Sequence, residues 1–380
     1  MWRALHDAWW RLATTTHPRS ITETLLSGVL QSSAVLYRVG VSARNQAYDT
    51  SLIRQARLPC PVISVGNLTV GGTGKTSCVE LVATKLQRFG RRPAVLSRGY
   101  GSVLRRPYWL FEREGQLLVN GQPDVSRDGL ADEPQLLASH LRNVPIMIGK
   151  RREQTGRQAC EQFQADVIVL DDGLQYRRLH RDCEIVLIQA RMPLGGWSLL
   201  PCGPMREPLS EIRRADVIII TKADQALGTS AALQERLKAL NPTAIIATAI
   251  HEPVGLWDGR TGEAIALDRL EKGRVSLLSS IGDPEGFEHT IRQRGATVVS
   301  HAAYPDHHRY QPDEYREALG VASASHAEAL VTTEKDFIRL RQINAVAEEA
   351  SLPLWVLRIR MHLLSGEERL DDRLARVCAR

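Results

Sequence analysis

Short aliphatic runs alternate with longer amphipathic segments through most of the chain. Such apolar runs are typical of strands buried on both faces of a sheet, and the segments between them repeat apolar positions at helical spacing. The alternation therefore predicts an α/β fold, with a parallel sheet covered by helices and one hairpin at 108–119. The strands are expected at residues 61–65, 93–97, 144–148, 167–170, 185–188 and 217–220, and the helices at 74–89, 133–141 and 152–163.

A polar helical segment at residues 226–240 marks a boundary, after which a second, smaller α/β unit begins. Its strands are expected at 244–250, 275–278, 297–299, 329–331 and 354–357, and its helices at 284–294 and 312–322. The predicted organisation is an N-terminal segment at 1–45, a larger domain at 46–225, a smaller domain at 226–365, and a final helix at 366–380 that packs back on the larger domain.

The composition is that of a globular chain. Its 380 residues are 43% hydrophobic and 24% charged, which supports a packed core and excludes disordered and collagen-like classes. The apolar runs are too short for a protein with several membrane-spanning helices. The net charge of +6 indicates an acidic partner, either nucleic acid or an anionic membrane. The six cysteines are widely spaced without a CxxC pair, as expected of thiols in a reducing compartment.

The basic surplus is concentrated at the N-terminus. Residues 1–57 hold seven arginines against three acidic residues, together with three of the seven tryptophans. Within them, residues 21–42 have an amphipathic helical pattern with a broad apolar face. Because Trp and Arg around an apolar face suit a lipid headgroup boundary, we expect a membrane-associating helix; the alternative is a helix packed on its own domain. The charge-free stretch between Glu23 and Arg38 is shorter than the roughly 17–25 residues of a standard span.

Residues 66–76, GNLTVGGTGKT, follow a predicted strand and open a predicted helix. This is the context of a P-loop, in which glycines let backbone N–H groups close around phosphate oxygens at the positive end of a helix. Lys75 would reach the terminal phosphates, and the Thr76 hydroxyl would bind Mg²⁺. The strict pattern has glycine at position 69, where this chain has threonine. The predicted phosphate-binding residues are Gly71, Gly72, Thr73, Gly74, Lys75 and Thr76.

An aliphatic strand ending in two carboxylates, at residues 167–172, has the form of a Walker B motif. Asp171 and Asp172 would lie where α/β sheets bind ligands, suited to Mg²⁺ and water. Residues 221–224, TKAD, follow another aliphatic strand. A similar NKxD segment reads guanine in GTPases, but threonine stands here in place of asparagine. The segment is either a base-facing loop or a plain strand-to-helix turn.

Further motifs follow the P-loop in a fixed order: SRGYG at 97–101, DEP at 132–134, DDGLQ at 171–175, GPMREP at 203–208, DHH at 306–308 and TTEKD at 332–336. Together with residues 66–76 they resemble one family, the tetraacyldisaccharide 4′-kinases of lipid A biosynthesis. A P-loop alone is generic, whereas this ordered set over residues 60–340 is highly specific. The family has a P-loop domain and a smaller α/β domain, which agrees with the two units predicted above.

The resemblance implies transfer of the γ-phosphate of ATP to the 4′-hydroxyl of a tetraacylated glucosamine disaccharide 1-phosphate, giving the bis-phosphorylated lipid A precursor. It implies Mg²⁺ dependence and a place at the cytoplasmic face of the inner membrane, with peripheral attachment or a single N-terminal helix anchor. The expected partners are the acylated lipid and an anionic membrane surface, with no nucleic acid. We expect a monomer.

The resemblance makes Asp132 the general base for the sugar hydroxyl and His307 its partner, although a position at a helix start alone favours an N-cap role for Asp132. Guanidinium groups suit a sugar-linked phosphate, and the alternative for any single arginine is a solvated surface charge. The predicted catalytic residues are Asp132, His307 and Lys75; the metal ligands Thr76, Glu207, Asp172 and Gln175; and the substrate-facing residues Arg98, Tyr100, Arg152, Tyr176, Arg206 and Asp171.

Three positions depart from the family pattern: Ser77 where proline is expected, Ala131 where glycine is expected, and Tyr176 where histidine is usual. None of them removes a catalytic group. Two other functions stay open from the residues alone. One is a P-loop GTPase or metallochaperone, suggested by residues 221–224 and 306–308, although no histidine-rich tract supports a metallochaperone. The other is a nucleotide-dependent membrane-binding module without catalysis.

Overall fold

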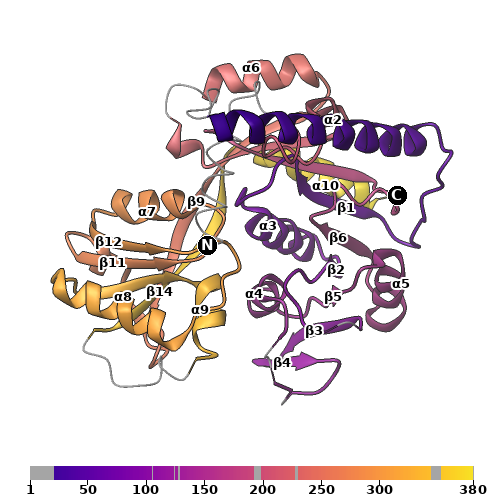
Figure 1. The fold of residues 1–380 in the computed structure, drawn as a ribbon. Coiled ribbons are helices and arrows are strands. Elements are labelled where there is room, and N and C mark those ends of the chain that lie inside the picture. Colours follow the sequence, from indigo (N-terminus) through magenta and orange to yellow (C-terminus); the bar gives the residue numbers. More distant parts are fainter. Residues whose placement is uncertain are drawn as a thin grey trace. The chain divides into compact units, whose positions relative to one another are not determined.

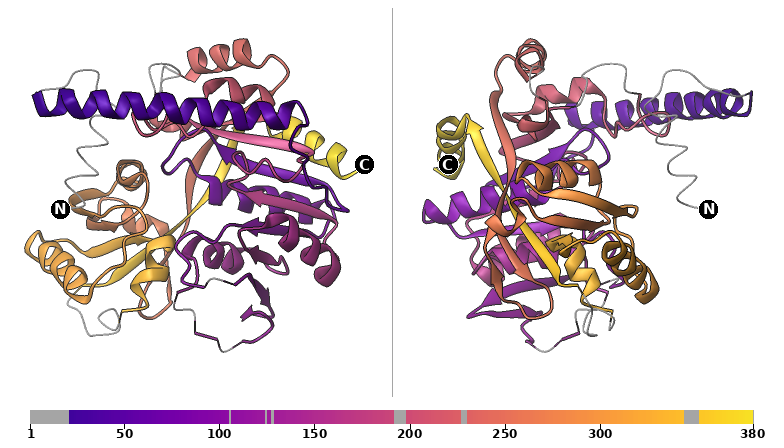
Figure 2. Two further views of the ribbon diagram at one scale, coloured as in Figure 1. Left: turned by 45° about the vertical axis from the view of Figure 1, so that its right-hand side comes forward. Right: turned by 90° about the vertical axis from the view of Figure 1, so that its left-hand side faces the viewer.

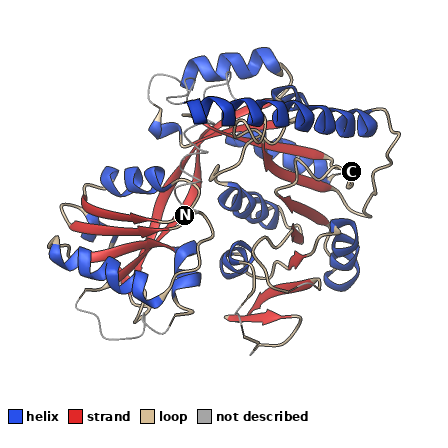
Figure 3. Cartoon of the chain, in the orientation of Figure 1, coloured by secondary structure: helices blue, strands red, loops and turns tan. Residues whose placement is uncertain are grey.

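The computed structural model describes residues 21–104, 106–123, 125–126, 129–191, 198–226, 230–343 and 352–379 (Figures 1 and 3). Residues 1–20 of the predicted N-terminal segment, with its three tryptophans, lie outside them. The chain forms two compact units: unit 1 takes residues 1–75, 152–249 and 363–380, and unit 2 takes 76–151 and 250–362. The predicted α/β fold class, with mainly parallel strands between helices, is confirmed.

Unit 1 contains parallel strands in the order β6-β1-β7-β8-β9. β1, β6 and β8 are buried along their whole length, as their mainly aliphatic sequences predict for a sheet covered on both faces. The strand bounds are β1 (Val62–Asn67), β6 (Val167–Asp171), β7 (Cys183–Gln189), β8 (Val217–Thr221) and β9 (Ile245–Asp258), of which the first part lies in this unit.

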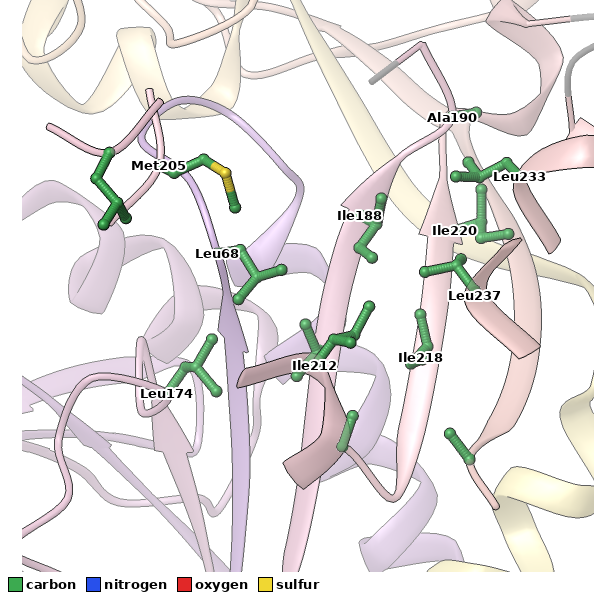
Figure 4. Close-up of a cluster of buried hydrophobic side chains, with 14 residues drawn as sticks. Leu68, Leu174, Ile188, Ala190, Met205, Ile212, Ile218, Ile220, Leu233 and Leu237 are labelled. Atoms are coloured by element: carbon green, nitrogen blue, oxygen red, sulfur yellow. The ribbon is translucent and has the colours of Figure 1, made fainter. Parts of the chain in front are cut away.

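A buried apolar cluster holds one face of this sheet against helix α6 (Ser230–Leu240) (Figure 4). In it, Ile218 and Ile220 of β8 pack with Leu237 of α6. Leu68 and Met205 extend the same cluster into the loops that follow β1 and precede the short helix η1 (Leu209–Arg214). Burying each such side chain contributes about 1.5–3 kcal/mol, so core packing fixes these loops at the end of the sheet.

Helix α2 (Ile21–Asp49) is one continuous helix in unit 1 (Figure 2). One of its faces packs on the unit through the buried residues Ala34, Val41 and Asn45, which are seven and four residues apart and so share one face of the helix. The opposite face carries four apolar side chains that are exposed by 61–75%: Val29, Val35, Leu36 and Val39. No helix among the residues described has both the length and the apolar character needed to cross a bilayer.

Unit 2 contains two groups of strands. The first has the order β2-β5-β3-β4, in which β2 and β5 are parallel and β3 is antiparallel to both of its neighbours. The second has the parallel order β12-β11-β13-β14. The bounds are β2 (Pro93–Ser97), β3 (Tyr108–Arg113), β4 (Gln116–Val119), β5 (Ile146–Ile148), β11 (Arg274–Ser279), β12 (Thr297–Ala303), β13 (Ala329–Thr333) and β14 (Leu354–Ser365).

The helices of unit 2 pack on these strands, and α4 and α9 lie against each other. α3 begins at Lys75, the last residue of unit 1, and continues in unit 2. The bounds are α3 (Lys75–Arg88), α4 (Asp132–His140), α7 (Pro284–Gln293), α8 (Pro312–Ala324) and α9 (Glu334–Leu340). A short strand, β10 (Ala264–Ile265), pairs antiparallel with the far part of β9.

Three features differ from the sequence expectations. Strands β9 and β14 extend well beyond the predicted 244–250 and 354–357, because their later parts mix polar and partly exposed residues with buried ones instead of being wholly apolar. Residues 334–340 form a helix that was not predicted, capped by the Thr333 side chain. The two units also differ from the predicted boundaries, since residues 76–151 group with 250–362. The division into kinase domain and smaller domain therefore stays a prediction.

The C-terminal helix α10 (Glu367–Cys378) lies on unit 1. It buries Leu370 and Leu374, and the Arg373 guanidinium donates to Asp216 at 2.6 Å. Residues 366–380 are thus joined to a loop of the segment 46–225 by an ion pair as well as by apolar burial.

Candidate functional site

The predicted phosphate loop joins β1 to α3. Gly71 and Gly74 have φ angles of 102° and 87°, which side chains rarely tolerate, so glycine is required for the course of this loop. Thr69, in place of the usual glycine, is buried and forms a β-bridge with Met205. Lys75 is the first residue of α3, where the helix N-terminus favours negative charge. The loop therefore has the form of an anion site.

Polar side chains of unit 1 form hydrogen bonds with the phosphate loop. Asn67 donates to the Thr73 hydroxyl at 2.9 Å and accepts from the Lys75 ammonium group at 3.2 Å. Lys222 donates to the Gly72 carbonyl at 2.8 Å. Thr221 donates to the Thr73 carbonyl at 3.1 Å. Two residues of the segment 221–224 are therefore engaged by the phosphate loop itself.

Asp172 lies in a cluster of basic side chains after β6. Both of its carboxylate oxygens accept from Arg206, at 2.8 and 3.0 Å, and the Lys75 ammonium group is 3.7 Å away. Arg152 donates to the Asp172 carbonyl at 3.3 Å. Burial raises the pKa of Asp172, but Lys75 and Arg206 outweigh it and lower that pKa to about 2. The carboxylate is therefore ionised at neutral pH and carries its charge next to the phosphate loop.

Asp171 and Gln175, also predicted for this site, flank Asp172 in sequence. Asp171 ends β6 and is buried. Gln175 donates to the Asn67 carbonyl at 2.9 Å, and its own side-chain oxygen is buried without a hydrogen bond among the described residues. A buried amide oxygen of this kind is a suitable ligand for a hard cation or a water bound to one.

Glu207, predicted as a metal ligand, is fully buried and faces α2. Its two carboxylate oxygens accept from the Arg44 guanidinium and, at 2.9 Å, from the Asn45 amide. The loop that carries Glu207 is joined to the phosphate loop, since the Arg206 N–H donates to the Leu68 carbonyl at 2.7 Å. Glu207 thus ties α2 to the segment beside the phosphate loop, and its role as a metal ligand stays a prediction.

The residues around the loop do not form a closed protein cage. The described residues contain no group of three or more His, Cys, Asp or Glu arranged to hold a metal. Mg²⁺ commonly keeps several waters and binds through one or two protein oxygens plus substrate phosphates. The Thr76 hydroxyl beside Lys75 and the side-chain oxygen of Gln175 are donors of that type. The donor set therefore fits Mg²⁺ bound together with a nucleotide.

The second group of predicted residues lies in unit 2. Asp132 is the first residue of α4, and its carboxylate is 3.1 Å from Nδ1 of His307. The residue is only 8% exposed. The N-cap of α4 is Ala131, so the N-cap alternative for Asp132 is wrong. The backbone at His307 is left-handed, with φ of 61°, and its ring centroid is 5.0 Å from that of Tyr100.

Two cations of α9 act on the Asp132 carboxylate. The Arg339 guanidinium is 3.6 Å from it, and the Lys335 ammonium group is bound by Glu133 at 2.9 Å and Asp306 at 3.1 Å. Burial raises the pKa of Asp132, but His307, Lys335 and Arg339 outweigh it and hold that pKa well below its usual range. The carboxylates near Lys335 raise its pKa in spite of burial. Both groups are therefore charged at neutral pH.

Arg339 is itself fixed by a fully buried carboxylate. Asp336 accepts from Arg339 at 2.9 Å and from the Ser280 hydroxyl at 2.8 Å. Its other oxygen accepts from the Thr333 hydroxyl at 2.8 Å. This network holds the Arg339 side chain, and both Lys335 and Arg339 contact carboxylates in the first turn of α4.

The chain matches the model of the family described as tetraacyldisaccharide-1-P 4′-kinase over residues 26–379. This chain belongs to that family. It is 41% identical over 342 residues to the tetraacyldisaccharide 4′-kinase of Syntrophus aciditrophicus, covering 88% of this chain and 89% of that protein. It is 39% identical over 378 residues to that of an Anaeromyxobacter species (strain Fw109-5), covering 98% and 96%.

A solved structure of the family has the same fold. It is the crystal structure of the "apo" form of LpxK from Aquifex aeolicus in complex with ATP. The TM-score is 0.68 at 30% sequence identity, and the match covers 93% of this chain and 99% of that chain. Family membership inferred from the ordered motifs is thus confirmed.

The predicted substrate-facing residues fall in both units. In unit 1 the Arg152 guanidinium lies 4.7 Å from the ring centroid of Tyr176, whose hydroxyl also donates to Glu153. The tyrosine that departs from the family pattern is therefore engaged by two neighbours on α5 (Arg152–Phe163). In unit 2, Arg98 and Tyr100 are exposed, as a role in contacting a ligand requires.

Several residues of the site were not singled out from the sequence. Asn67 lies inside the P-loop motif, and Lys335 and Asp336 lie inside the TTEKD motif, yet no role followed from those positions. Arg339 lies one helical turn beyond that motif. A helical pattern through residues 334–340 would have placed Lys335 and Arg339 on one face, because residues four apart are neighbours on a helix.

Proposed function

We propose that this chain transfers the γ-phosphate of ATP to the 4′-hydroxyl of a tetraacylated glucosamine disaccharide 1-phosphate. The observation that carries the proposal is the buried Asp132 carboxylate, 3.1 Å from His307, in a chain that also holds a P-loop. Membership of the family and the ATP in the related crystal structure support the choice of substrates. The product would be the bis-phosphorylated lipid A precursor.

The phosphate loop would bind ATP through backbone N–H groups and Lys75. Lys75 lies 3.7 Å from Asp172, and this ion pair would be exchanged for one with the terminal phosphates. Thr76 and Gln175 would hold Mg²⁺ with Asp171 or Asp172, and the ion would supply positive charge as the phosphoryl group leaves. Arg152 and Arg206 would then be available for phosphate oxygens of either substrate.

Asp132 would receive the proton of the attacked hydroxyl. The transition state of phosphoryl transfer is loose, so the proton leaves late and a weakly basic carboxylate suffices. His307 would orient the carboxylate, and Lys335 and Arg339 would keep it ionised. General-base assistance of this kind contributes about 10²- to 10⁴-fold to the rate.

A GTPase or metallochaperone is not favoured. Thr221 and Lys222 of the GTPase-like segment donate to phosphate-loop carbonyls. The histidines of residues 306–308 have other partners, since His307 contacts Asp132 and His308 contacts Glu314 at 2.7 Å. Both observations support a structural or acceptor-side role for the residues that suggested these alternatives.

The test of function uses γ-labelled ATP, Mg²⁺ and vesicles that contain the disaccharide 1-phosphate. Label on the lipid supports the kinase, label released only as inorganic phosphate supports hydrolysis, and no release at all supports a binding module. A preparation of Lys75→Ala, checked for an unchanged melting temperature, serves as the control for contaminating kinases, because it lacks the phosphate-binding ammonium group.

We also propose that α2 places the enzyme on the cytoplasmic face of the inner membrane. Its outer face carries Val29, Val35, Leu36 and Val39, all more than half exposed, while its inner face packs on unit 1. Such an arrangement suits a peripheral helix lying in the headgroup region, where apolar area and anionic lipids both contribute to binding.

The outer face is tested by a double substitution, Leu36→Asp with Val39→Asp. We expect loss of binding to anionic vesicles in a flotation assay, with unchanged ATP binding and melting temperature. The matched control is Leu364→Asp, which adds a charge at another exposed leucine of unit 1, 55% exposed. Vesicle binding that is unchanged in the double variant would contradict the proposal. The expected monomer is checked on the same samples by light scattering.

A further inference from the structure

A buried histidine joins three helices of unit 2. His140 is the last residue of α4, and its side chain is 5% exposed. Its Nδ1 is 2.9 Å from a Glu80 carboxylate oxygen on α3, and its Nε2 is 3.0 Å from a Glu334 carboxylate oxygen on α9. The ring therefore bridges two carboxylates that come from different helices.

Two carboxylate contacts require a proton on each ring nitrogen, because ionised carboxylates only accept hydrogen bonds. The ring in this arrangement is an imidazolium. Arg358 and Arg360 of β14 lie 3.3 and 3.6 Å from Glu80, and Arg358 is 4.0 Å from Glu334. β3 also packs on α4, but Glu112 there accepts from the Gly115 N–H at 2.8 Å and Arg113 pairs with Glu114.

Each joined helix also carries residues of the proposed reaction. α3 begins with Lys75 and Thr76, α4 begins with Asp132, and α9 presents Arg339 to the Asp132 carboxylate and Lys335 to the neighbouring Glu133. We call the two contacts of the His140 ring, to Glu80 and to Glu334, the tie. A change in the tie therefore changes how α4 packs against α9, and this changes the direction of the Asp132 carboxylate. Misplacement of a catalytic group by about 1 Å can lower a rate by about 10²-fold.

We propose that His140 is a positioning residue for phosphoryl transfer, whose doubly hydrogen-bonded ring fixes α3, α4 and α9 and thereby aims the Asp132 carboxylate. The proposal rests on the proposed function. It concerns the kcat of the reaction and leaves ATP binding unchanged, because the phosphate loop is held by Asn67, Thr221 and Lys222 of unit 1 and not by the ring.

The tie depends on pH. Burial lowers the pKa of His140, but Glu334 and Glu80 outweigh it and raise that pKa to about 9. Because the pKa in the folded chain is above the ordinary value of about 6.5, the stabilisation is complete below about pH 6.5 and is lost as pH rises through about 9. The tie is therefore intact at neutral pH and opens under alkaline conditions.

The experiment compares wild type with His140→Gln and Glu80→Gln. The ring proton of His140 is titrated by NMR, and kcat and KM for ATP are measured across the same pH range. We expect the alkaline fall of wild-type kcat to coincide with the titration of the ring, and both midpoints to move together to lower pH in Glu80→Gln. For His140→Gln we expect kcat lowered about 10- to 100-fold at neutral pH, no such alkaline fall, and unchanged KM for ATP.

The proposal is overturned if His140→Gln has the kcat of wild type. It is also overturned if Glu80→Gln shifts the titration of the His140 ring but leaves the alkaline midpoint of kcat in place. A lowered melting temperature with unchanged kcat would also overturn it, since that result assigns the histidine to stability alone. If His140→Gln does not fold, Glu80→Gln and the NMR titration still decide the case.

Backbone amide exchange of α4 and α9, measured against α8 of the same unit, gives a readout without lipid. We expect the relative protection of α4 and α9 to fall as the ring loses its proton; constant relative protection would overturn the tie. If wild type transfers no phosphate to the lipid under any condition, the proposed function is refuted. The amide-exchange result needs no lipid and therefore tests the tie independently of the proposed function.

Discussion

Replacing Asp132 by asparagine removes a buried negative charge and keeps the size of the side chain. The amide can still contact His307, but it cannot receive the proton of the attacked hydroxyl. General-base assistance contributes about 10²- to 10⁴-fold, which corresponds to about 2.7–5.4 kcal/mol of transition-state stabilisation. We therefore expect kcat to fall by that factor while ATP affinity is unchanged, because the phosphate loop is formed by other residues.

The pH dependence sharpens this prediction. The pKa of Asp132 is lowered, since His307, Lys335 and Arg339 outweigh burial. The stabilisation that the ionised carboxylate gives is present above its unfolded pKa of about 3.9 and is lost only as pH falls through the lower pKa of the folded chain. Between about pH 5 and 8 the carboxylate stays ionised, so the loss of kcat in Asp132→Asn is expected to be constant over that range.

The assay measures initial rates of labelled-phosphate transfer and, separately, ATP binding by calorimetry. Asp313→Asn is the matched control, because that aspartate is on α8 and its side chain is 96% exposed. A kcat of Asp132→Asn within about threefold of wild type would refute the assignment of the base. A deficit that shrinks as pH falls from 8 to about 5 would refute the reasoning about its ionisation.

Three further predictions concern the phosphate loop, the partner of the base and helix α2. Lys75→Ala is expected to lower kcat more than Asp132→Asn does, and the reverse order in the same transfer assay would mean that the two roles are wrongly assigned. His307→Ala is expected to lower kcat and to alter its pH profile, so full activity with an unchanged profile would remove His307 from the site. Arg44→Met leaves the buried Glu207 carboxylate with one fewer hydrogen-bond donor, and Arg44 is itself partly exposed. We expect the free energy of unfolding to fall by about 1–3 kcal/mol, which lowers the melting temperature by about 2–4 °C per kcal/mol. A melting temperature equal to that of the exposed control Arg38→Met would contradict this.

Local sequence patterns predicted the sheet of unit 1 and the phosphate loop well. β6 and β8 are aliphatic up to their last residue and β1 is mainly aliphatic, and a short buried run of this kind has few alternatives in an α/β chain. The loop motif is contiguous, so its residues are near each other in any fold. The later parts of β9 and β14 were not predicted because polar residues interrupt the apolar pattern there.

Contacts between distant positions could not be predicted from local pattern. Asp132 and His307 are 175 positions apart, and only the family resemblance placed them together. The contacts of Glu207 with Arg44 and Asn45 join segments more than 160 positions apart. The bridge from Glu80 through His140 to Glu334 likewise depends on tertiary packing, since nothing in the three local sequences marks a shared site. Single glutamates and histidines on helices are as common on solvent-exposed faces as in functional sites, so their presence alone indicates nothing.

The most direct test of the central claim is to identify the acceptor atom. Wild-type protein is incubated with ATP, Mg²⁺ and the tetraacylated disaccharide 1-phosphate, and the product is examined by phosphorus–proton correlation NMR. The account predicts a new phosphate coupled to the proton at the 4′ carbon, formed by wild type and lost in Asp132→Asn. A phosphate at any other position, or ATP consumed with no phosphate on the lipid, would contradict it.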